Sequence, residues 1–216
     1  MRSEIFNCDC MEYMANLPDN AFELAIVDPP YRDLNQPDQW MRATGGKMKG
    51  FGKTPNLSYF DELSRVSGNF ICWGGNYFTE HLPSNNNWIV WYKMNDGVHF
   101  SMAELAYSTI RRNVKVWHHM HNGATGKIHP TQKPVKLYEW LLKNYAKQGD
   151  RILDTHLGSG SSAIAAYNMG FDFVGCEIDK DYFEAAKNRI DKHMAQGRLF
   201  EPVPMANNNY KQEVLF

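Results

Sequence analysis

Short apolar runs bounded by turn-forming residues recur along the chain and alternate with segments that repeat apolar residues at helical spacing. The short runs predict seven buried strands, at residues 4–7, 23–27, 69–73, 88–92, 104–109, 151–154 and 171–176. The periodic segments predict five helices, at residues 11–16, 57–65, 134–146, 161–168 and 181–194. Strands that alternate with helices are typical of a mostly parallel sheet with helices on both faces, so we expect an α/β fold.

Two segments follow neither pattern. Residues 32–55 are long and Gly-rich, which predicts a mobile loop of the kind that often carries function. Residues 197–216 are polar and contain two prolines, which predicts a loosely ordered tail. Because 216 residues suit a single domain, we expect residues 1–196 to form it.

The composition excludes several classes of protein. Apolar residues make up 43% and charged residues 22% of the chain, which rules out a disordered or collagenous protein. No apolar stretch reaches the roughly 18–20 residues of a membrane span, and the first residues lack the apolar core of a signal peptide. Four cysteines are too few for a disulfide scaffold, so we expect a soluble protein of the reducing cytoplasm.

Positive charge is concentrated in two segments although the whole chain has a net charge of −1. Residues 109–136 contain six Lys and Arg residues and no acid, and residues 32–53 contain five such residues and two acids. This distribution predicts a local surface for a polyanion such as nucleic acid. The alternative is that both segments are simply solvated basic loops.

Asp28, Pro29, Pro30 and Tyr31 directly follow the predicted strand 23–27. Ligands of open α/β sheets bind at this end of the strands. Proline fixes φ and has no N–H, so the turn is stiff. A carboxylate, a free carbonyl and an aromatic ring can together hold a planar group that carries an NH₂. The alternative is an ordinary Asp-Pro turn.

A second candidate site is the glycine-rich turn after the predicted strand 151–154. Gly158 and Gly160 allow a ligand to approach the backbone, and Glu177, after the next strand, is placed to hold ribose hydroxyls. The pattern also fits a dinucleotide fingerprint. However, Asp154 lies four residues before the first glycine, and this wide spacing favours a nucleoside–amino-acid cofactor without pyrophosphate.

Four blocks in this order resemble the β class of amino-group DNA methyltransferases, in which the DPPY motif precedes the S-adenosylmethionine (SAM) motif. They are residues 7–10 with 17–19, DPPY at 28–31, HPTQKP at 129–134, and LDTHLGSGSS at 153–162 with GCEIDKDYFEAAKNRI at 175–190. The resemblance covers most of the chain. It implies a Rossmann-like SAM-dependent methyltransferase fold and an enzyme that transfers a methyl group from SAM to DNA without a metal.

The resemblance also implies roles for individual residues. Catalysis would fall to Asp28, Pro29, Pro30 and Tyr31. Asp9 would contact the adenine of SAM, Glu177 its ribose, and Thr131, Gln132 and Lys133 its methionine end, with Lys133 paired to the carboxylate. Asp154, Gly158 and Gly160 would cradle the cofactor.

The cofactor turn departs from the usual family pattern LDPFxGSGTT, because Thr155 replaces Pro and His156 replaces Phe. Histidine titrates near neutral pH, so we expect the affinity for SAM to depend on pH through His156.

In this family the segment 93–127 would recognise the target sequence. The expected contacts to double-stranded DNA come from basic residues of both segments: Arg32, Arg42, Lys47, Lys49, Arg111, Arg112, Lys115 and Lys127. His118, His119 and His121 lack partners at metal-ligand spacing, so we predict no metal.

Adenine N6 is the expected target, because DPPY is the usual adenine form in this family. N4 of cytosine, a non-catalytic DNA-binding module of the same fold and a nicotinamide oxidoreductase remain alternatives. Two Gln-x-x-Leu-Phe strings, at 196–200 and 212–216, resemble peptides that dock on the bacterial sliding clamp, although they could instead pack on the domain. We expect a monomer or a homodimer.

Overall fold

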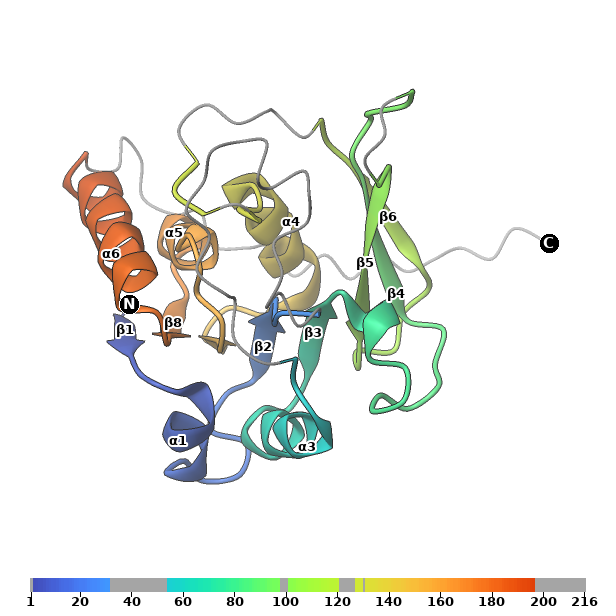
Figure 1. The fold of residues 1–216 in the computed structure, drawn as a ribbon, viewed down its shortest axis with the longest axis horizontal. Coiled ribbons are helices and arrows are strands. Elements are labelled where there is room, and N and C mark those ends of the chain that lie inside the picture. The colour runs from blue at the N-terminus through green and yellow to red at the C-terminus, as the bar shows by residue number, and fades with distance from the viewer. Residues whose placement is uncertain (1, 32–53, 98–100, 121–126, 130, 197–216) are drawn as a thin grey trace.

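The computed structural model describes residues 2–31, 54–97, 101–120, 127–129 and 131–196. The two tail strings, apart from Gln196, and almost all of the predicted loop 32–55 lie outside these residues. The described strands form one eight-stranded sheet in the order β1-β8-β7-β2-β3-β5-β4-β6, from β1 at the left of Figure 1 to β6 at the right. The strands are β1 (Ser3–Asn7), β2 (Leu24–Val27), β3 (Phe70–Trp73), β4 (Trp88–Tyr92), β5 (Ala103–Ser108), β6 (Lys115–His118), β7 (Arg151–Asp154) and β8 (Asp172–Glu177). The helices are α1 (Cys10–Ala15), α3 (Leu57–Val66), α4 (Val135–Tyr145), α5 (Ser161–Met169) and α6 (Lys180–Ala195), with a 3₁₀ turn η1 (Gly75–Tyr77).

All seven predicted strands and all five predicted helices are present, with each end within one residue of its expected position. Strand β6 was missed. It has only four residues, its side chains are alternately half-buried and exposed, and it pairs with β4 alone. Such a short, half-polar edge strand has no apolar run that would mark it in the sequence.

The sheet is mostly parallel, as predicted, and this brings the candidate residues together. Among the described strands only β5 runs against its neighbours, β3 and β4. Strands β1, β8, β7, β2 and β3 all run in the same direction. The segments that follow them therefore meet at one edge of the sheet, where open α/β sheets bind their ligands.

Helices cover both faces of the sheet, which confirms the expected architecture (Figure 1). Successive residues of β2 point to opposite faces. Leu24 and Ile26 pack with α4, α5 and α6, whereas Ala25 and Val27 pack with α1 and α3. Since β2 is buried on both faces, the carboxylate that follows it is held on a rigid support.

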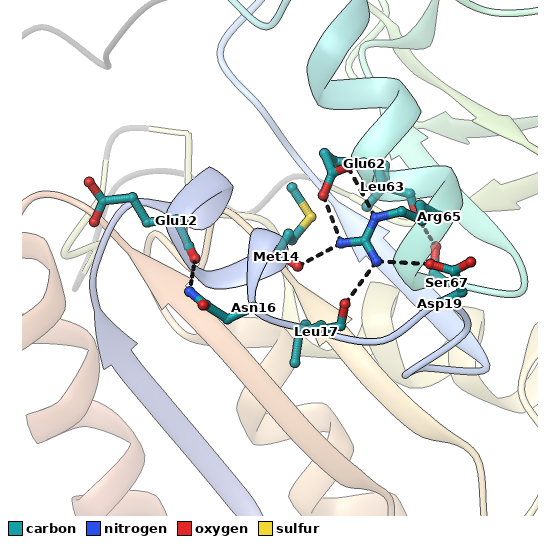
Figure 2. Close-up of polar contacts among 9 residues, drawn as sticks. All are labelled: Glu12, Met14, Asn16, Leu17, Asp19, Glu62, Leu63, Arg65 and Ser67. Carbon is teal, nitrogen blue, oxygen red and sulfur yellow. Dashed lines mark hydrogen bonds and ion pairs between the residues drawn. The ribbon is translucent and has the colours of Figure 1, made fainter.

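On the α1–α3 side, Arg65 ties the two helices together. Figure 2 shows its guanidinium between the Glu62 carboxylate on α3, the Asp19 carboxylate and the carbonyls of Met14 and Leu17. The closest contacts, to Glu62 and to the two carbonyls, are 2.8 Å. This cluster uses none of the candidate site residues.

No helix in the described part of the chain is both long enough and apolar enough to cross a membrane. All four cysteines are free thiols, in keeping with the prediction that the chain is not a disulfide scaffold.

Candidate active site

A cavity of about 860 Å³ opens at the edge of the sheet where β1, β2, β7 and β8 end. Its volume lies in the range of small-molecule sites, roughly 300–1,000 Å³. Eleven of the predicted catalytic and cofactor residues line it: Asp9, Asp28, Pro29, Pro30, Tyr31, Thr131, Gln132, Lys133, His156, Gly158 and Glu177. The structure therefore brings together segments that are far apart in the sequence.

Asp28, the first residue after β2, is nearly buried, with 14% of its side chain exposed. Its Oδ2 pairs with Lys133, whereas its Oδ1 is buried and accepts no hydrogen bond from any described residue. Burial raises the pKa of Asp28, and the ammonium of Lys133 opposes this shift. An orphaned buried acceptor at a cavity wall is suited to receive an N–H from a ligand.

The ammonium of Lys133 is held by two carboxylates of the protein. It forms ion pairs with Asp28 and, at 3.3 Å, with Glu104, and its side chain is only 2% exposed. Burial alone would lower the pKa of Lys133, but these two carboxylates raise it well above its usual value. Two protein carboxylates therefore share the charge of Lys133, and its expected pairing with the methionine carboxylate stays a prediction.

Glu104 is a site residue that the sequence reasoning missed. It lies within β5, and its carboxylate contacts Lys133 and, at 2.7 Å, Lys93. Burial raises the pKa of Glu104, but the two ammonium groups lower it to about 2. The one signal in the sequence was a charged residue within an otherwise uncharged strand.

Tyr31 is held by two residues that the sequence did not single out. Its ring stacks on Tyr77 with centroids 4.8 Å apart and planes 4° apart. Gly74 lies against the ring with φ of +68°, and a Cβ there would lie 2.7 Å from Cε1 of Tyr31. The ring is fixed in orientation before any ligand binds.

Asp154 and Gly160 lie behind the cavity wall and are not among the residues that line it. The Asp154 carboxylate accepts hydrogen bonds from the His156 N–H at 3.0 Å and from Ser162 Oγ at 2.5 Å. Burial raises the pKa of Asp154 to about 7. Gly160 packs against Ile190 of α6, and a Cβ would lie 2.9 Å from its Cδ1. Both residues shape the glycine turn from beneath.

His156 lines the cavity, but its environment contradicts the expected titration near neutral pH. Its Nδ1 lies 2.9 Å from Thr155 Oγ1, and its ring packs edge-on against Tyr59. Burial lowers the pKa of His156 to about 4. The imidazole is therefore neutral throughout the physiological range.

Two further carboxylates, Glu177 and Asp9, line the cavity. Glu177 accepts hydrogen bonds from the Gly158 N–H at 2.8 Å and the Asp179 N–H at 3.0 Å, so it links β8 to the glycine turn. Burial raises the pKa of Glu177. Asp9 caps α1 by accepting from the Met11 N–H at 2.7 Å.

Comparison with known proteins identifies the family to which the chain belongs. A family model for the N6/N4 methyltransferases, described as DNA methylase, matches residues 61–188, more than half of the chain. The chain belongs to this DNA methylase family. It is 24% identical over 88% of its length to the type II methyltransferase M.HpaI of Haemophilus parainfluenzae, of which it covers 75%.

Solved structures of the same fold agree with this membership. A crystal structure of the M1.HpyAVI–SAM complex superimposes with a TM-score of 0.62 at 20% identity, over 88% of this chain and 99% of the other. The PvuII DNA methyltransferase, described as cytosine-N4-specific, superimposes with a TM-score of 0.61 at 12% identity, over 90% and 91%. The chain is thus a SAM-dependent amino-group DNA methyltransferase with a Rossmann-like fold.

The cavity of this methylase fits its cofactor. Gly158 lines the cavity and has φ of +49°, a conformation that favours glycine. Because glycine has no side chain, a ligand can approach the backbone of the turn there. Carboxylates at Glu177 and Asp9, on the same side, can accept hydrogen bonds from ribose hydroxyls and an adenine amino group.

The basic residues predicted to hold DNA are distributed unevenly around the methylase. Arg32, Arg42, Lys47 and Lys49 lie outside the described residues. The Lys115 ammonium donates to Asn144 Oδ1 at 2.9 Å, and Arg112 lies over the Tyr145 ring, so both contact the end of α4. Lys115 begins β6, four strands from β2, which is roughly 19 Å at the usual strand spacing.

Among the cations predicted to contact DNA, Lys127 interacts electrostatically with Lys93 and Glu104. Burial lowers the pKa of Lys127, and so does the ammonium of Lys93, whereas the carboxylate of Glu104 opposes this shift. Arg111 is exposed on the segment before β6. Lys127 is therefore a predicted DNA contact that interacts with the charged residues beside Asp28.

No group of three or more metal-ligating side chains occurs within the described residues. His119 stacks on Trp117 at 4.6 Å, and His118 packs edge-on against Tyr92. His121 lies outside the described residues. The two described histidines thus belong to an aromatic cluster at the end of β6.

Proposed function

We propose that this methylase transfers a methyl group from SAM to the N6 amino group of adenine in double-stranded DNA, and that it does so in the cavity at the end of β2. The observation that carries the proposal is Oδ1 of Asp28, which is buried in the wall of that cavity and has no hydrogen-bond partner among the described residues. An exocyclic amino group supplies the donor that this oxygen lacks. The two prolines that follow leave the Pro29 carbonyl in a stiff turn as a second acceptor.

The cofactor is expected to contact Asp9, Gly158 and Glu177, together with Thr131 and Gln132, all of which line the cavity. Asp154 and Gly160 do not line the cavity and would cradle the cofactor by supporting the glycine turn. When bound, SAM supplies a methyl group on a sulfonium centre, whose sulfur keeps the bonding electrons when the methyl group leaves.

The protein has to make a poor nucleophile react. The lone pair of an aromatic amine is delocalised into the ring. Hydrogen bonds to Asp28 and the Pro29 carbonyl draw the nitrogen toward tetrahedral geometry, so that its lone pair faces the methyl donor. The nitrogen loses one proton as the N–C bond forms, and Oδ1 of Asp28 is the acceptor. Alignment of this kind contributes up to about 7–11 kcal/mol in ideal systems.

Tyr31 holds the plane of the base. An adenine inside a duplex has to be flipped out of the stack, which costs a few kcal/mol. Stacking on an aromatic side chain offsets about 1–3 kcal/mol of that cost. Because Tyr77 and Gly74 already fix the Tyr31 ring, little ordering of the ring is required at the moment of binding.

Cytosine N4 is the second candidate target. The DPPY sequence favours adenine, whereas the similarity in fold to the cytosine-N4-specific PvuII enzyme keeps the alternative open. Both bases present an amino group beside a ring nitrogen, so Asp28 by itself does not distinguish them.

The proposal is tested by incubating purified protein with SAM carrying a labelled methyl group and with unmethylated duplex DNA of mixed sequence. Wild-type protein is expected to label the DNA, and Asp28→Ala is expected to lose at least about 100-fold in rate, as when a polar group that stabilises a transition state is removed. SAM affinity, measured by calorimetry, is expected to remain within about threefold. Protein that binds DNA but neither binds SAM nor labels DNA would instead be the non-catalytic module.

A further inference from the structure

Four charged side chains from four segments form a continuous line beside the cavity: Asp28, Lys133, Glu104 and Lys93. The Lys133 ammonium joins Asp28 Oδ2 to Glu104 Oε2, and the Lys93 ammonium lies 2.7 Å from Glu104 Oε1. The charges alternate in sign and sum to zero. A neutral chain of this kind lowers the cost of burying each charge.

We infer that Glu104 is a positioning residue, which sets how strongly Lys133 pairs with Asp28, and that Lys93 weakens this effect of Glu104. This inference rests on the proposed function, because it concerns the carboxylate that receives the amino group of the base.

The geometry gives Lys133 two competing anions. Its Nζ lies between Asp28 and Glu104 and 5.5 Å from the centre of the Trp73 ring, which leaves little room to move elsewhere. Asp28 pairs with Lys133 through Oδ2, and its Oδ1 has no hydrogen-bond partner in the described part of the chain. Glu104 shares the charge of Lys133, so Asp28 does not neutralise it alone. Without the charge of Glu104, Asp28 alone would neutralise Lys133 and would be a weaker acceptor for the base.

Lys93 acts on the same balance with the opposite sign. Its ammonium neutralises the other oxygen of Glu104. When the charge of Lys93 is removed, Glu104 attracts Lys133 more strongly, and the hold of Lys133 on Asp28 is weakened. A purely structural role for the two residues would not give opposite effects, since removing either partner breaks the same ion pair.

The protonation of Asp28 reports this balance. Burial raises the pKa of Asp28, Lys133 and Lys93 lower it, and Glu104 raises it. Among the described residues, the other ionisable groups on which the charge of Asp28 acts are Tyr31, Cys72, Tyr138 and Asp154. The first three have pKa values above their ordinary range and stay protonated near neutrality. Asp154, with a pKa of about 7, is the one that titrates in the working range.

The experiment measures the single-turnover rate of labelled methyl transfer to unmethylated duplex DNA of mixed sequence between about pH 5 and 9, for wild type, Glu104→Gln and Lys93→Met. The midpoint of the acid limb is expected to move down by about half a pH unit or more in Glu104→Gln and up by a similar amount in Lys93→Met. SAM affinity is expected to stay within about twofold in both. Glu62→Gln, which makes the same change in the remote Arg65 cluster of Figure 2, is the matched control and should leave the midpoint in place.

Midpoints that stay in place or move in the same direction overturn the inference. If the acid limb of the pH profile reflects the titration of Asp154 instead of Asp28, its midpoint will not move in either variant, and this result also counts against the inference. If Glu104→Gln does not fold, Lys93→Met decides, because an upward shift supports the inference and an unchanged midpoint contradicts it. Wild-type protein that leaves the DNA unlabelled would overturn the proposed function instead, so the two failures are distinguishable.

Discussion

Lys133 and Asp28 form an ion pair in the wall of the cavity although 105 residues separate them in the sequence. The hexapeptide that contains Lys133 is thereby connected to the DPPY turn, and its ammonium is held by carboxylates of the protein. This arrangement changes what a substitution at Lys133 is expected to do.

Lys133→Met is expected to destabilise the fold by about 3–5 kcal/mol, because it leaves buried carboxylates without their shared partner. The rate of methyl transfer should fall, while SAM affinity stays within about threefold. Denaturant unfolding and calorimetry measure the two quantities. If Lys133 instead held the methionine carboxylate, loss of a charged hydrogen bond of about 1.5–3 kcal/mol would weaken SAM binding by roughly 10- to 150-fold.

His156 is not expected to make the affinity for SAM depend on pH between 5.5 and 8. Its pKa is about 4, so the ring does not change charge in that range. Calorimetric titrations of wild type and His156→Phe at several pH values are expected to give parallel profiles. A change in wild type around pH 6.5 that His156→Phe lacks would show that the ring titrates after all.

Asp154 makes the stability of the protein depend on pH. Its pKa is about 7 in the folded protein and about 4 in the unfolded chain, so the folded state binds the proton more tightly between these values. Its contribution to the free energy of unfolding is therefore present below about pH 4 and is lost as the pH rises through 7. The loss reaches at most about 4 kcal/mol.

The measurement compares denaturant unfolding of wild type and Asp154→Asn at pH 4.5 and 7.5. Wild type is expected to lose stability relative to Asp154→Asn as the pH rises. If the free energy of unfolding changes equally in the two proteins between pH 4.5 and 7.5, Asp154 is ionised in the folded protein at both pH values.

Gly74 lies against the ring of Tyr31, the proposed catalytic tyrosine, and Gly74→Ala is expected to reduce activity by more than its cost in stability explains. The residue has φ of +68°, where alanine costs about 1–2 kcal/mol, and the added methyl would also displace the Tyr31 ring. Gly149→Ala is the matched control, with φ of +93° and no atom within 4 Å of the added Cβ. Equal losses of activity in the two variants would argue against a role in holding Tyr31.

Much of the fold was predictable because its signals are local. A buried strand such as Leu24–Val27 is a continuous apolar run, and an amphipathic helix such as Leu57–Val66 repeats at helical spacing. The glycine turn and the DPPY segment were likewise contiguous in the sequence. Given a parallel sheet, their meeting at one edge followed from topology.

The electrostatics of the site was not predictable, because it arises between segments far apart in the chain. Glu104 reaches Lys133 because β5 runs antiparallel beside β3, and no local pattern specified that pairing. His156 was expected to titrate near neutrality because its ordinary pKa lies there, but its burial depends on Tyr59 and Thr155. Tyr77 was missed for the same reason, since its role depends on contact with Tyr31.

The central claim is that Asp28 receives an amino group of a DNA base, and the most direct test is to identify the methylated nucleoside. Duplex DNA treated with the protein and SAM is digested to nucleosides and analysed by mass spectrometry. We expect N6-methyladenine with wild-type protein and none above background with Asp28→Ala. N4-methylcytosine as the product would keep the role of Asp28 but contradict the adenine target. Wild-type protein that leaves every nucleoside unmodified, or Asp28→Ala that methylates at the wild-type rate, would contradict the claim itself.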